Sequence, residues 1–260
     1  PYVRSGRLAS ELAPLQKAAF VETLDYYARI SNLDNPYIIA EISCNHKQKL
    51  TKVFKMIDAA KFAGASAIKL QTFTPDSMTL DINKKDFIIQ DGLWKDAKLF
   101  DLYKEAHLPY EYHKPIFNYA RKKKITCFTS VFDIEGFRFL EKNFNLPAYK
   151  ISSFENNYFN LLDEIIKKNK PIILSTGATE IKEITEIINF FKKRKFKKLI
   201  LLHCVSAYPA NFKDCNLTNI NDFKKKFGCL VGFSDHTKGI LGSLSAIAQG
   251  AVVIEKHFNY

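Results

Sequence analysis

The sequence predicts an α/β fold in which eight parallel strands close into a (β/α)8 TIM barrel. Two patterns support this prediction. Short apolar runs alternate with segments whose apolar residues recur at helical spacing, as in a parallel sheet covered by helices. Eight such runs with seven helical segments between them favour a closed barrel over an open sheet. Neither GxGxxG nor GxxxxGK(S/T) occurs, which weakens a nucleotide-binding open sheet as the alternative.

The apolar runs place the strands. The first is Tyr37-Ile38-Ile39-Ala40, which ends in the carboxylate of Glu41. The runs that follow are equally short and bounded by polar or turn-forming residues, as buried strands are. We expect strands at residues 37–41, 67–71, 125–130, 148–151, 171–174, 199–202, 230–233 and 251–254.

Apolar stripes and capping residues place the helices. Gly64 is suited to end the first helix, and Asp133 and Thr179 are suited to cap the start of two later ones. The connection 72–109 is too long for an ordinary turn, so it is a candidate functional loop. We expect the covering helices near residues 53–63, 112–124, 133–144, 161–168, 179–191, 219–227 and 240–248.

The chain divides into an N-terminal helical segment of uncertain origin, residues 1–33, and a barrel domain, residues 34–260. Arg4, Arg7 and Arg29 lie in the first part, whereas the second part is rich in Lys, Ile, Asn and Phe. The chain stops three residues after His257, where an eighth helix would begin. We therefore expect a barrel without its usual final helix, and one hypothesis is that residues 8–30 cover the gap.

Composition excludes several classes of protein. Hydrophobic residues make up 47% and charged residues 25% of the 260 residues, as in soluble globular proteins. No apolar run approaches the ~20 residues that span a bilayer, so we predict no membrane partner. Five cysteines without CxxC spacing favour a reducing cytoplasm over a disulfide framework.

The formal net charge of +12 raises the question of nucleic acid. The lysines come in short runs at the ends of predicted helices, where cations interact favourably with the helix dipole. They are not interleaved with aromatic residues on one face. We interpret them as solvated surfaces and predict no nucleic-acid partner.

Polar residues gather where the predicted strands end, and in a barrel those ends converge on one mouth. Lysines with hydroxyl groups suit a phosphate, and two histidines near carboxylates suit a divalent metal. Each such residue alone is more often a salt-bridged, capping or hydrogen-bonded group, but nearly every strand ends this way. The strand-end residues are Glu41, Lys69, Gln71, Thr129, Ser130, Lys150, Ser152, Ser153, Glu155, Ser175, Thr176, Gly177, His203, Ser206, Tyr208, Ser234, Asp235, His236, Glu255 and His257.

Six spaced motifs stand in order along the chain: Ile39-Ala40-Glu41-Ile42 with Asn45-His46, Lys69-Leu70-Gln71-Thr72, Tyr149-Lys150-Ile151-Ser152-Ser153-Phe154-Glu155, Leu174-Ser175-Thr176-Gly177, Ser234-Asp235-His236 and Glu255-Lys256-His257-Phe258. Together they resemble the motif set of the sialic acid synthases, which condense phosphoenolpyruvate with an acylamino sugar. The resemblance runs from about residue 35 to the end of the chain.

The resemblance implies a role for each matching residue. His236 and His257 match ligands of a divalent metal, Mn²⁺ or Mg²⁺. Glu41 and Glu155 match acidic residues near the reacting carbons and, with Lys69, are the predicted catalytic residues. The predicted substrate-binding residues are Lys69, Gln71, Ser130, Lys150, Ser153, Ser175, Ser206, Tyr208, Ser234 and Asp235, with Ser206 and Tyr208 facing the sugar.

Loop motifs indicate the branch of the family. Asp86-Phe87-Ile88-Ile89 and Pro109-Tyr110-Glu111-Tyr112-His113 look most like the pseudaminic acid branch, whose sugar is 2,4-diacetamido-2,4,6-trideoxy-altrose. Ser206 stands where the neuraminate branch has asparagine. The family also implies a homodimer and a C-terminal antifreeze-like domain. That domain is absent from this sequence, so we expect phosphoenolpyruvate and metal to bind but condensation to be weak.

Three other interpretations remain open at this stage. A neuraminate or legionaminate synthase would share the same scaffold. A phosphoenolpyruvate aldol enzyme acting on sugar phosphates would need a second, arginine-rich phosphate site, and beyond residue 33 only Arg121, Arg138 and Arg194 occur. An inactive barrel that serves as a basic binding module would bind nucleic acid in a strongly salt-dependent way.

Overall fold

A computed structural model describes residues 30, 35–91 and 94–258. It shows a closed barrel of eight parallel strands in the order β1 to β8, which confirms the predicted fold class. The final strand pairs with the first, so that Tyr37 lies beside Val253 and Glu41 beside His257. The strands are β1 (Tyr37–Glu41), β2 (Ala67–Thr72), β3 (Thr126–Val131), β4 (Tyr149–Ile151), β5 (Ile172–Ser175), β6 (Leu199–Cys204), β7 (Leu230–Asp235) and β8 (Val253–His257).

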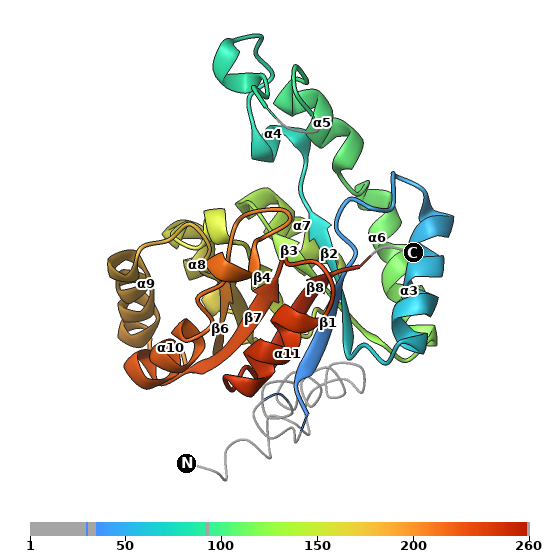
Figure 1. Ribbon diagram of the computed structural model, residues 1–260. Coiled ribbons are helices and arrows are strands. Elements are labelled where there is room, and N and C mark those ends of the chain that lie inside the picture. Colours follow the sequence, from blue (N-terminus) through green and yellow to red (C-terminus); the bar gives the residue numbers. More distant parts are fainter. Residues whose placement is uncertain (1–29, 31–34, 92–93, 259–260) are drawn as a thin grey trace.

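Seven helices of the described chain connect successive strands and cover the outside of the barrel (Figure 1). Their buried residues recur three or four positions apart, as in α9, where Ile184, Ile187, Ile188 and Phe191 face the sheet. The covering helices are α3 (Leu50–Phe62), α6 (Tyr110–Lys122), α7 (Ile134–Asn143), α8 (Phe159–Ile166), α9 (Ile181–Lys193), α10 (Asn219–Phe227) and α11 (Leu241–Ala248).

The helix starts match the expectations in one case and differ in another. Asp133 caps α7 as predicted, because its Oδ1 accepts a hydrogen bond of 2.6 Å from the Gly136 amide. Thr179 does not cap α9. Glu180 and Glu183 form a capping box there, and the Thr179 hydroxyl instead donates to the Gly177 carbonyl.

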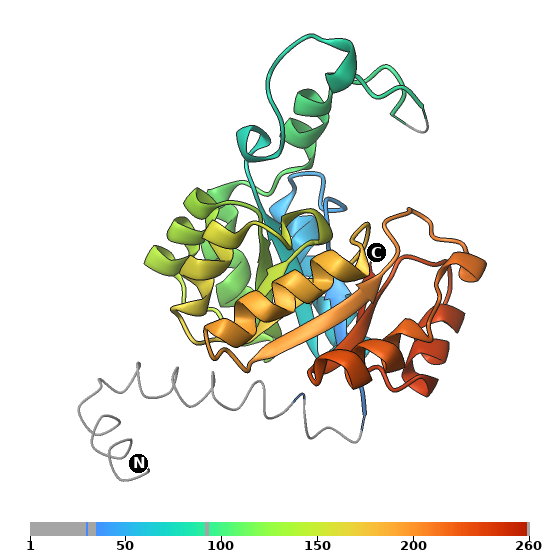
Figure 2. The same ribbon diagram turned by 90° about the vertical axis from the view of Figure 1, so that its left-hand side faces the viewer.

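The long connection between β2 and α6 forms an arm that projects beyond the carboxyl ends of the strands (Figures 1 and 2). It contains α4 (Pro75–Met78), a 3-10 turn at Lys85–Phe87 and α5 (Leu99–Ala106). At its base, Phe73 packs edge-on against Tyr103 and against Phe132. The arm therefore stands beside the mouth where polar strand ends were predicted.

Apolar side chains close the opposite end of the barrel. Ile30 is 1% exposed and belongs to the same buried cluster as Ile39, Phe128 and Val253. The hypothesis that residues 8–30 cover the β8–β1 gap lies outside the described residues apart from Ile30, as does the proposed N-terminal segment. In the described part of the chain, no helix is long and apolar enough to cross a membrane.

Candidate functional site at the barrel mouth

Alternation along the strands sorts the strand-end residues into an inner and an outer set. Successive side chains of a strand point to opposite faces, so the residues two positions beyond an inward apolar residue also point inward. Ile39 and Val253 lie in the inner cluster, and Glu41 and Glu255 follow two positions later. The lower barrel is thus filled with apolar side chains, and the layer above it is ionic.

Lys69 lies at the centre of the ionic layer and is 3% exposed. Its ammonium group forms an ion pair with Glu41, donates to the Ser130 hydroxyl at 3.0 Å and lies 3.5 Å from Glu255. Burial alone would lower the pKa of Lys69, but the charges of Glu255 and Glu41 keep it above its ordinary value. Lys69 is therefore a fixed positive charge beneath the mouth.

Glu255 lies between the two inward lysines. Its Oε1 is 3.6 Å from Lys150 Nζ and accepts a hydrogen bond of 3.1 Å from the Ser234 hydroxyl. Burial alone would raise the pKa of Glu255, but Lys150 and Lys69 lower it to about 2. Burial lowers the pKa of Lys150, against the effect of Glu255. The predicted residues Lys69, Ser130, Lys150 and Ser234 are thus brought together.

His236 and His257 meet at the rim above this layer, with ring centroids 5.3 Å apart. The Tyr208 ring lies 4.1 Å from the His236 ring and 5.4 Å from the His257 ring. A cavity of about 210 Å³ opens beside them, lined also by Asp235 and Lys256 among others. The two predicted metal ligands and one predicted sugar contact therefore share one place.

The protonation of His236 suits a metal ligand. Its Nδ1 lies 2.7 Å from the Val205 carbonyl, which can only accept, so Nδ1 carries the proton. Burial lowers the pKa of His236 to about 4, so the ring is neutral at pH 7 and Nε2 keeps its lone pair. Within the described residues, no group of three His, Cys, Asp or Glu side chains could hold a metal ion. Two imidazoles fit a divalent metal whose other ligands are water and substrate oxygens.

The β4 to β6 side of the mouth is packed closely around Gly177. The Ser153 hydroxyl accepts a hydrogen bond of 3.0 Å from the Gly177 amide. A Cβ atom at Gly177 would collide with the Ser206 hydroxyl and lie 2.9 Å from that of Ser153. Ser175 Oγ is buried and has no hydrogen-bond partner among the described residues, as expected of a group that awaits a ligand.

Glu155 also has a buried polar atom without a hydrogen bond among the described residues, as do Glu41 and Glu255, whose free oxygens lie beside Lys69. In Glu155 this atom is Oε2. Burial raises the pKa of Glu155 to about 7, although the charge of Lys150 opposes the shift. A carboxyl group with this pKa can give or take a proton at neutral pH. Gln71 lies on the β1–β2 side, where its Oε1 accepts from the Cys44 thiol at 3.6 Å.

Asp235 and His203 point away from the mouth. The Asp235 carboxylate accepts hydrogen bonds from Thr237, Ser243 and Lys256 on the outer side of the sheet. His203 Nε2 donates to the Cys215 carbonyl at 2.6 Å, so His203 is a satisfied buried side chain. The role of Asp235 in substrate binding stays a prediction.

Sequence reasoning assigns no role to Glu255 or Cys204, although both face the ionic layer. Glu255 stands two positions before His257, so strand alternation signals that both share a face. The Cys204 thiol lies 3.9 Å from Ser153 Oγ and 3.9 Å from His236 Nδ1. Nothing in its sequence surroundings distinguishes Cys204 from an ordinary core cysteine.

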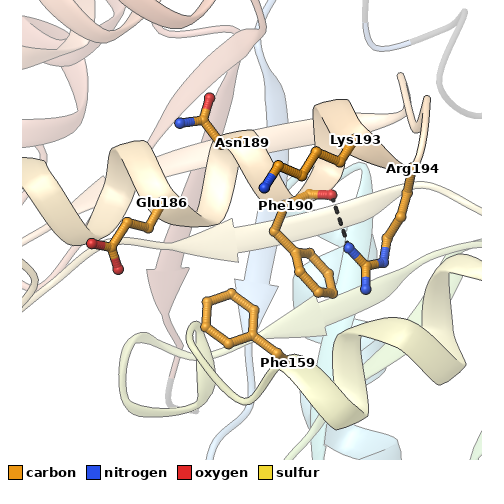
Figure 3. Close-up of a pocket in the computed structure, with 6 residues that line it drawn as sticks. All are labelled: Phe159, Glu186, Asn189, Phe190, Lys193 and Arg194. Carbon is orange, nitrogen blue, oxygen red and sulfur yellow. Dashed lines mark hydrogen bonds between the residues drawn. The ribbon is translucent and has the colours of Figure 1, made fainter.

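A larger cavity, of about 310 Å³, lies on the flank of the barrel between α8 and α9 (Figure 3). Phe159 and Phe190 form its apolar wall, with ring centroids 4.8 Å apart. The Arg194 guanidinium group stacks on Phe190 at 3.5 Å and pairs with Asp163. This cavity contains none of the strand-end residues, so the mouth is the better candidate for chemistry.

The fold and the mouth define a TIM-barrel protein with a buried cationic floor and a two-histidine rim. Residues 56–260 match the NeuB family. The chain belongs to the NeuB family, which confirms the resemblance found in its motifs.

Three relatives illustrate the match. Pseudaminic acid synthase of Campylobacter jejuni (strain 81-176) is 50% identical over 222 residues, which cover 85% of this chain and 64% of the relative. Pseudaminic acid synthase of Helicobacter pylori is 40% identical over 226 residues, with coverages of 87% and 66%. The chain thus spans just under two thirds of the length of these curated relatives. The solved structure of N-acetylneuraminic acid synthetase from Leptospira borgpetersenii, in complex with citrate, is 33% identical, with a TM-score of 0.77 and coverages of 87% and 74%.

Proposed function

We propose that this chain carries the catalytic barrel of a pseudaminic acid synthase. The reaction condenses phosphoenolpyruvate with 2,4-diacetamido-2,4,6-trideoxy-altrose and water to give pseudaminic acid and phosphate. The observation that carries the proposal is that two groups of residues lie one above the other in the barrel mouth. The lower group, here called the floor, holds Lys69, Lys150 and the hydroxyl groups beside them, and the upper group is the pair His236 and His257. The similarity to two pseudaminic acid synthases supports this choice of sugar.

The floor would bind phosphoenolpyruvate. Lys69 and Lys150 offer positive charge, and Ser130 and Ser234 offer hydroxyl groups beside them. The unpartnered hydroxyl of Ser175 adds a donor at the neighbouring strand end. Glu255 holds both lysines in place before the anion arrives, which reduces the reorganisation needed on binding.

The rim would bind the metal and the sugar. His236 and His257 would hold Mn²⁺ or Mg²⁺, which when bound would polarise the aldehyde of the open-chain sugar. Tyr208 is 68% exposed and lies over both histidines, so its ring can cover the sugar from the solvent side. Ser206 lies next to Gly177 on the same side of the mouth.

The acidic residues would transfer protons and position water. C3 of phosphoenolpyruvate forms a bond to the aldehyde carbon, and the aldehyde oxygen takes a proton to become a hydroxyl group. Glu155 is suited to give that proton because its pKa lies near 7. Water, positioned by Glu41, then adds at the electron-deficient C2 and gives one proton back to Glu155. The tetrahedral centre breaks its C2–O bond, phosphate leaves with the electron pair and takes the proton of the new C2 hydroxyl, and C2 becomes the ketone carbon.

A comparison of three sugars, each offered separately, tests this proposal. The chain is mixed with phosphoenolpyruvate, Mn²⁺ and one of three amino sugars, the precursors of pseudaminic, legionaminic or neuraminic acid. Phosphate release and product mass are measured at enzyme concentrations that reveal a single turnover. We expect product only, or at least tenfold more, from the altrose derivative. Preference for another precursor would overturn the choice of sugar, and light scattering of the same sample tests the proposed homodimer.

A further inference from the structure

An ion pair lies on the outer side of the barrel wall, directly behind the two histidines. β7 and β8 are hydrogen-bonded neighbours, and Asp235 stands opposite Lys256 in their register. Lys256 Nζ lies 2.8 Å from Asp235 Oδ2. Each member of this pair immediately precedes one of the histidines in the chain, so alternation turns the pair outward and the histidines toward the mouth.

The Asp235 carboxylate is saturated by this arrangement. Its Oδ1 accepts from the Thr237 amide at 2.8 Å and from the Thr237 hydroxyl at 2.7 Å. Its Oδ2 accepts from the Ser243 hydroxyl at 2.5 Å and from Lys256. A carboxylate has about four lone-pair sites, and all four are used here. Asp235 therefore has little capacity left to bind a substrate group.

Lys256 forms a second hydrogen bond to the segment after β7, because its ammonium group also donates to the Thr237 carbonyl at 2.8 Å. The start of α11 packs tightly against the hydrogen-bonded side chains of Asp235 and Thr237. A Cβ atom at Gly242 would lie 2.6 Å from the Thr237 hydroxyl and 3.1 Å from Asp235 Oδ1. The chain that follows His236 is thus fixed to β8 through Lys256.

His257 is held from its other side by the backbone. The Phe258 amide donates to the Glu41 carbonyl at 2.8 Å, which continues the β8–β1 pairing past His257. On the β7 side, the register pairs stop at Asp235 and Lys256, one position before the histidines. Beyond that point, the side chains of Asp235 and Lys256 replace the ladder as the link between the two strands.

We propose that Asp235 and Lys256 are positioning residues that set the separation and orientation of His236 and His257. The inference rests on the proposed role of the two histidines as metal ligands. A metal ion binds more tightly when its donor atoms already converge, so a link between the segments that carry them contributes to affinity. Asp235 and Lys256 also line the cavity beside the histidines, but the charged group of each is engaged by protein partners.

Metal affinity of four variants tests this inference. Mn²⁺ binding is measured by isothermal titration calorimetry and by electron paramagnetic resonance for the wild-type chain, Asp235→Asn, Lys256→Met, Lys256→Arg and the control Asp58→Asn. Asp58 pairs with Lys123 at 2.7 Å on the barrel exterior. We expect Lys256→Met and Asp235→Asn to weaken binding by about tenfold or more, in the range seen when groups that orient metal ligands are removed. Lys256→Arg should stay within about threefold of wild type, because Arg can keep the charge and the link to Asp235.

The outcomes separate this inference from the proposed function. If the wild-type chain bound Mn²⁺ and Lys256→Met bound it equally well while remaining folded, the positioning role would be overturned and the metal site would stand. If the wild-type chain bound no Mn²⁺, the metal site would fail and the inference with it. Thermal unfolding is recorded for each variant. Loss of affinity in Lys256→Met with unchanged unfolding temperature supports positioning, whereas equal loss in Asp58→Asn would overturn it.

Discussion

The Glu255 carboxylate lies 3.6 Å from the Lys150 ammonium group, and both side chains are buried inside the barrel, 5% and 2% exposed. Glu255 also lies 3.5 Å from Lys69. One carboxylate therefore serves two buried cations, and it does so at the place where we propose that phosphoenolpyruvate binds. The charge of Glu255 acts to raise the pKa of each lysine, against the effect of burial.

Glu255→Gln should destabilise the fold. The buried lysines Lys69 and Lys150 would then have only the Glu41 carboxylate, which pairs with Lys69, as an ion-pair partner among the described residues. Removing one partner of a buried ion pair costs about 3–5 kcal/mol, and we expect a loss of about 3 kcal/mol in the free energy of unfolding by urea. Millimolar phosphate should raise the unfolding temperature of the variant more than that of wild type, because it restores an anion near the lysines. Glu164→Gln, which removes an exposed pair with Lys167, is the control and should cost less than about 0.5 kcal/mol. Equal losses in the two variants would contradict the prediction.

Glu155→Gln should change how both stability and turnover depend on pH. Burial raises the pKa of Glu155 to about 7, so the folded protein holds a proton that the unfolded chain releases near pH 4.5. This contribution to stability is complete below pH 4.5 and is lost as pH rises through 7. The variant should therefore gain stability relative to wild type at pH 8, measured by urea unfolding, and show no such gain at pH 4.5.

The same substitution tests the role of Glu155 as a proton donor. Wild-type phosphate release should fall above pH 7, where the carboxyl group ionises. Glu155→Gln should be slower by about a hundredfold, and its rate should lose this dependence on pH. A variant that kept the wild-type pH profile would assign the titration to another group.

His236→Ala and His257→Ala should each abolish measurable Mn²⁺ binding in calorimetry. The described residues provide no third His, Cys, Asp or Glu close enough to replace a lost ligand. His107→Ala is the matched control, since His107 bonds Gln48 and the Lys104 carbonyl beside the arm. Metal affinity that survived in both ligand variants would show that the site lies elsewhere.

The strand ends could be predicted because the apolar runs and their polar ends are explicit in the sequence. The direction of each side chain could not. A strand of this barrel is buried on both faces, so its apolar run does not reveal which residues point inward. Asp235 and Glu255 illustrate the result: both are strand-end carboxylates, yet the first faces α11 and the second faces two lysines.

Contacts between residues far apart in the chain could not be predicted from the sequence either. The sequence places His113 in a loop motif at the start of a predicted helix and indicates no partner for it. In the structure it lies on α6, and its Nε2 is 2.7 Å from the Thr72 hydroxyl at the end of β2. The sequence identifies Gly177 as a strand-end residue and as the last residue of the motif Leu174-Ser175-Thr176-Gly177, but it gives no packing reason for a glycine there. A residue with a side chain would not fit at position 177, because the hydroxyl groups of Ser153 and Ser206 occupy that space. These two serines lie at the ends of different strands.

Gly177→Ala should impair ligand binding more than folding. The new methyl group would collide with the Ser206 hydroxyl and approach that of Ser153 to 2.9 Å, so both side chains must move. We expect phosphoenolpyruvate affinity to fall about tenfold, measured by calorimetry, while the unfolding temperature changes by only a few degrees. Ser206→Gly in the Gly177→Ala background removes the nearer collision and should restore part of the affinity. Unchanged affinity in Gly177→Ala would contradict the packing argument.

His113→Gln should reduce the loss of stability at low pH. His113 is fully buried, its Nδ1 donates to the Pro109 carbonyl, and its Nε2 accepts from the Thr72 hydroxyl. Burial lowers the pKa of His113 from 6.5 to about 4. As pH falls, His113 of the unfolded chain therefore takes up a proton near pH 6.5, whereas His113 of the folded protein takes one up only near pH 4. This contribution to stability is present above pH 6.5 and is lost as pH falls toward 4. This shift corresponds to about 3 kcal/mol between pH 7 and pH 4. Gln cannot titrate but can still donate and accept, so the variant should lack this part of the slope in urea unfolding at successive pH values. His107→Gln should keep it, and a slope unchanged in His113→Gln would show that another buried group causes the acid sensitivity.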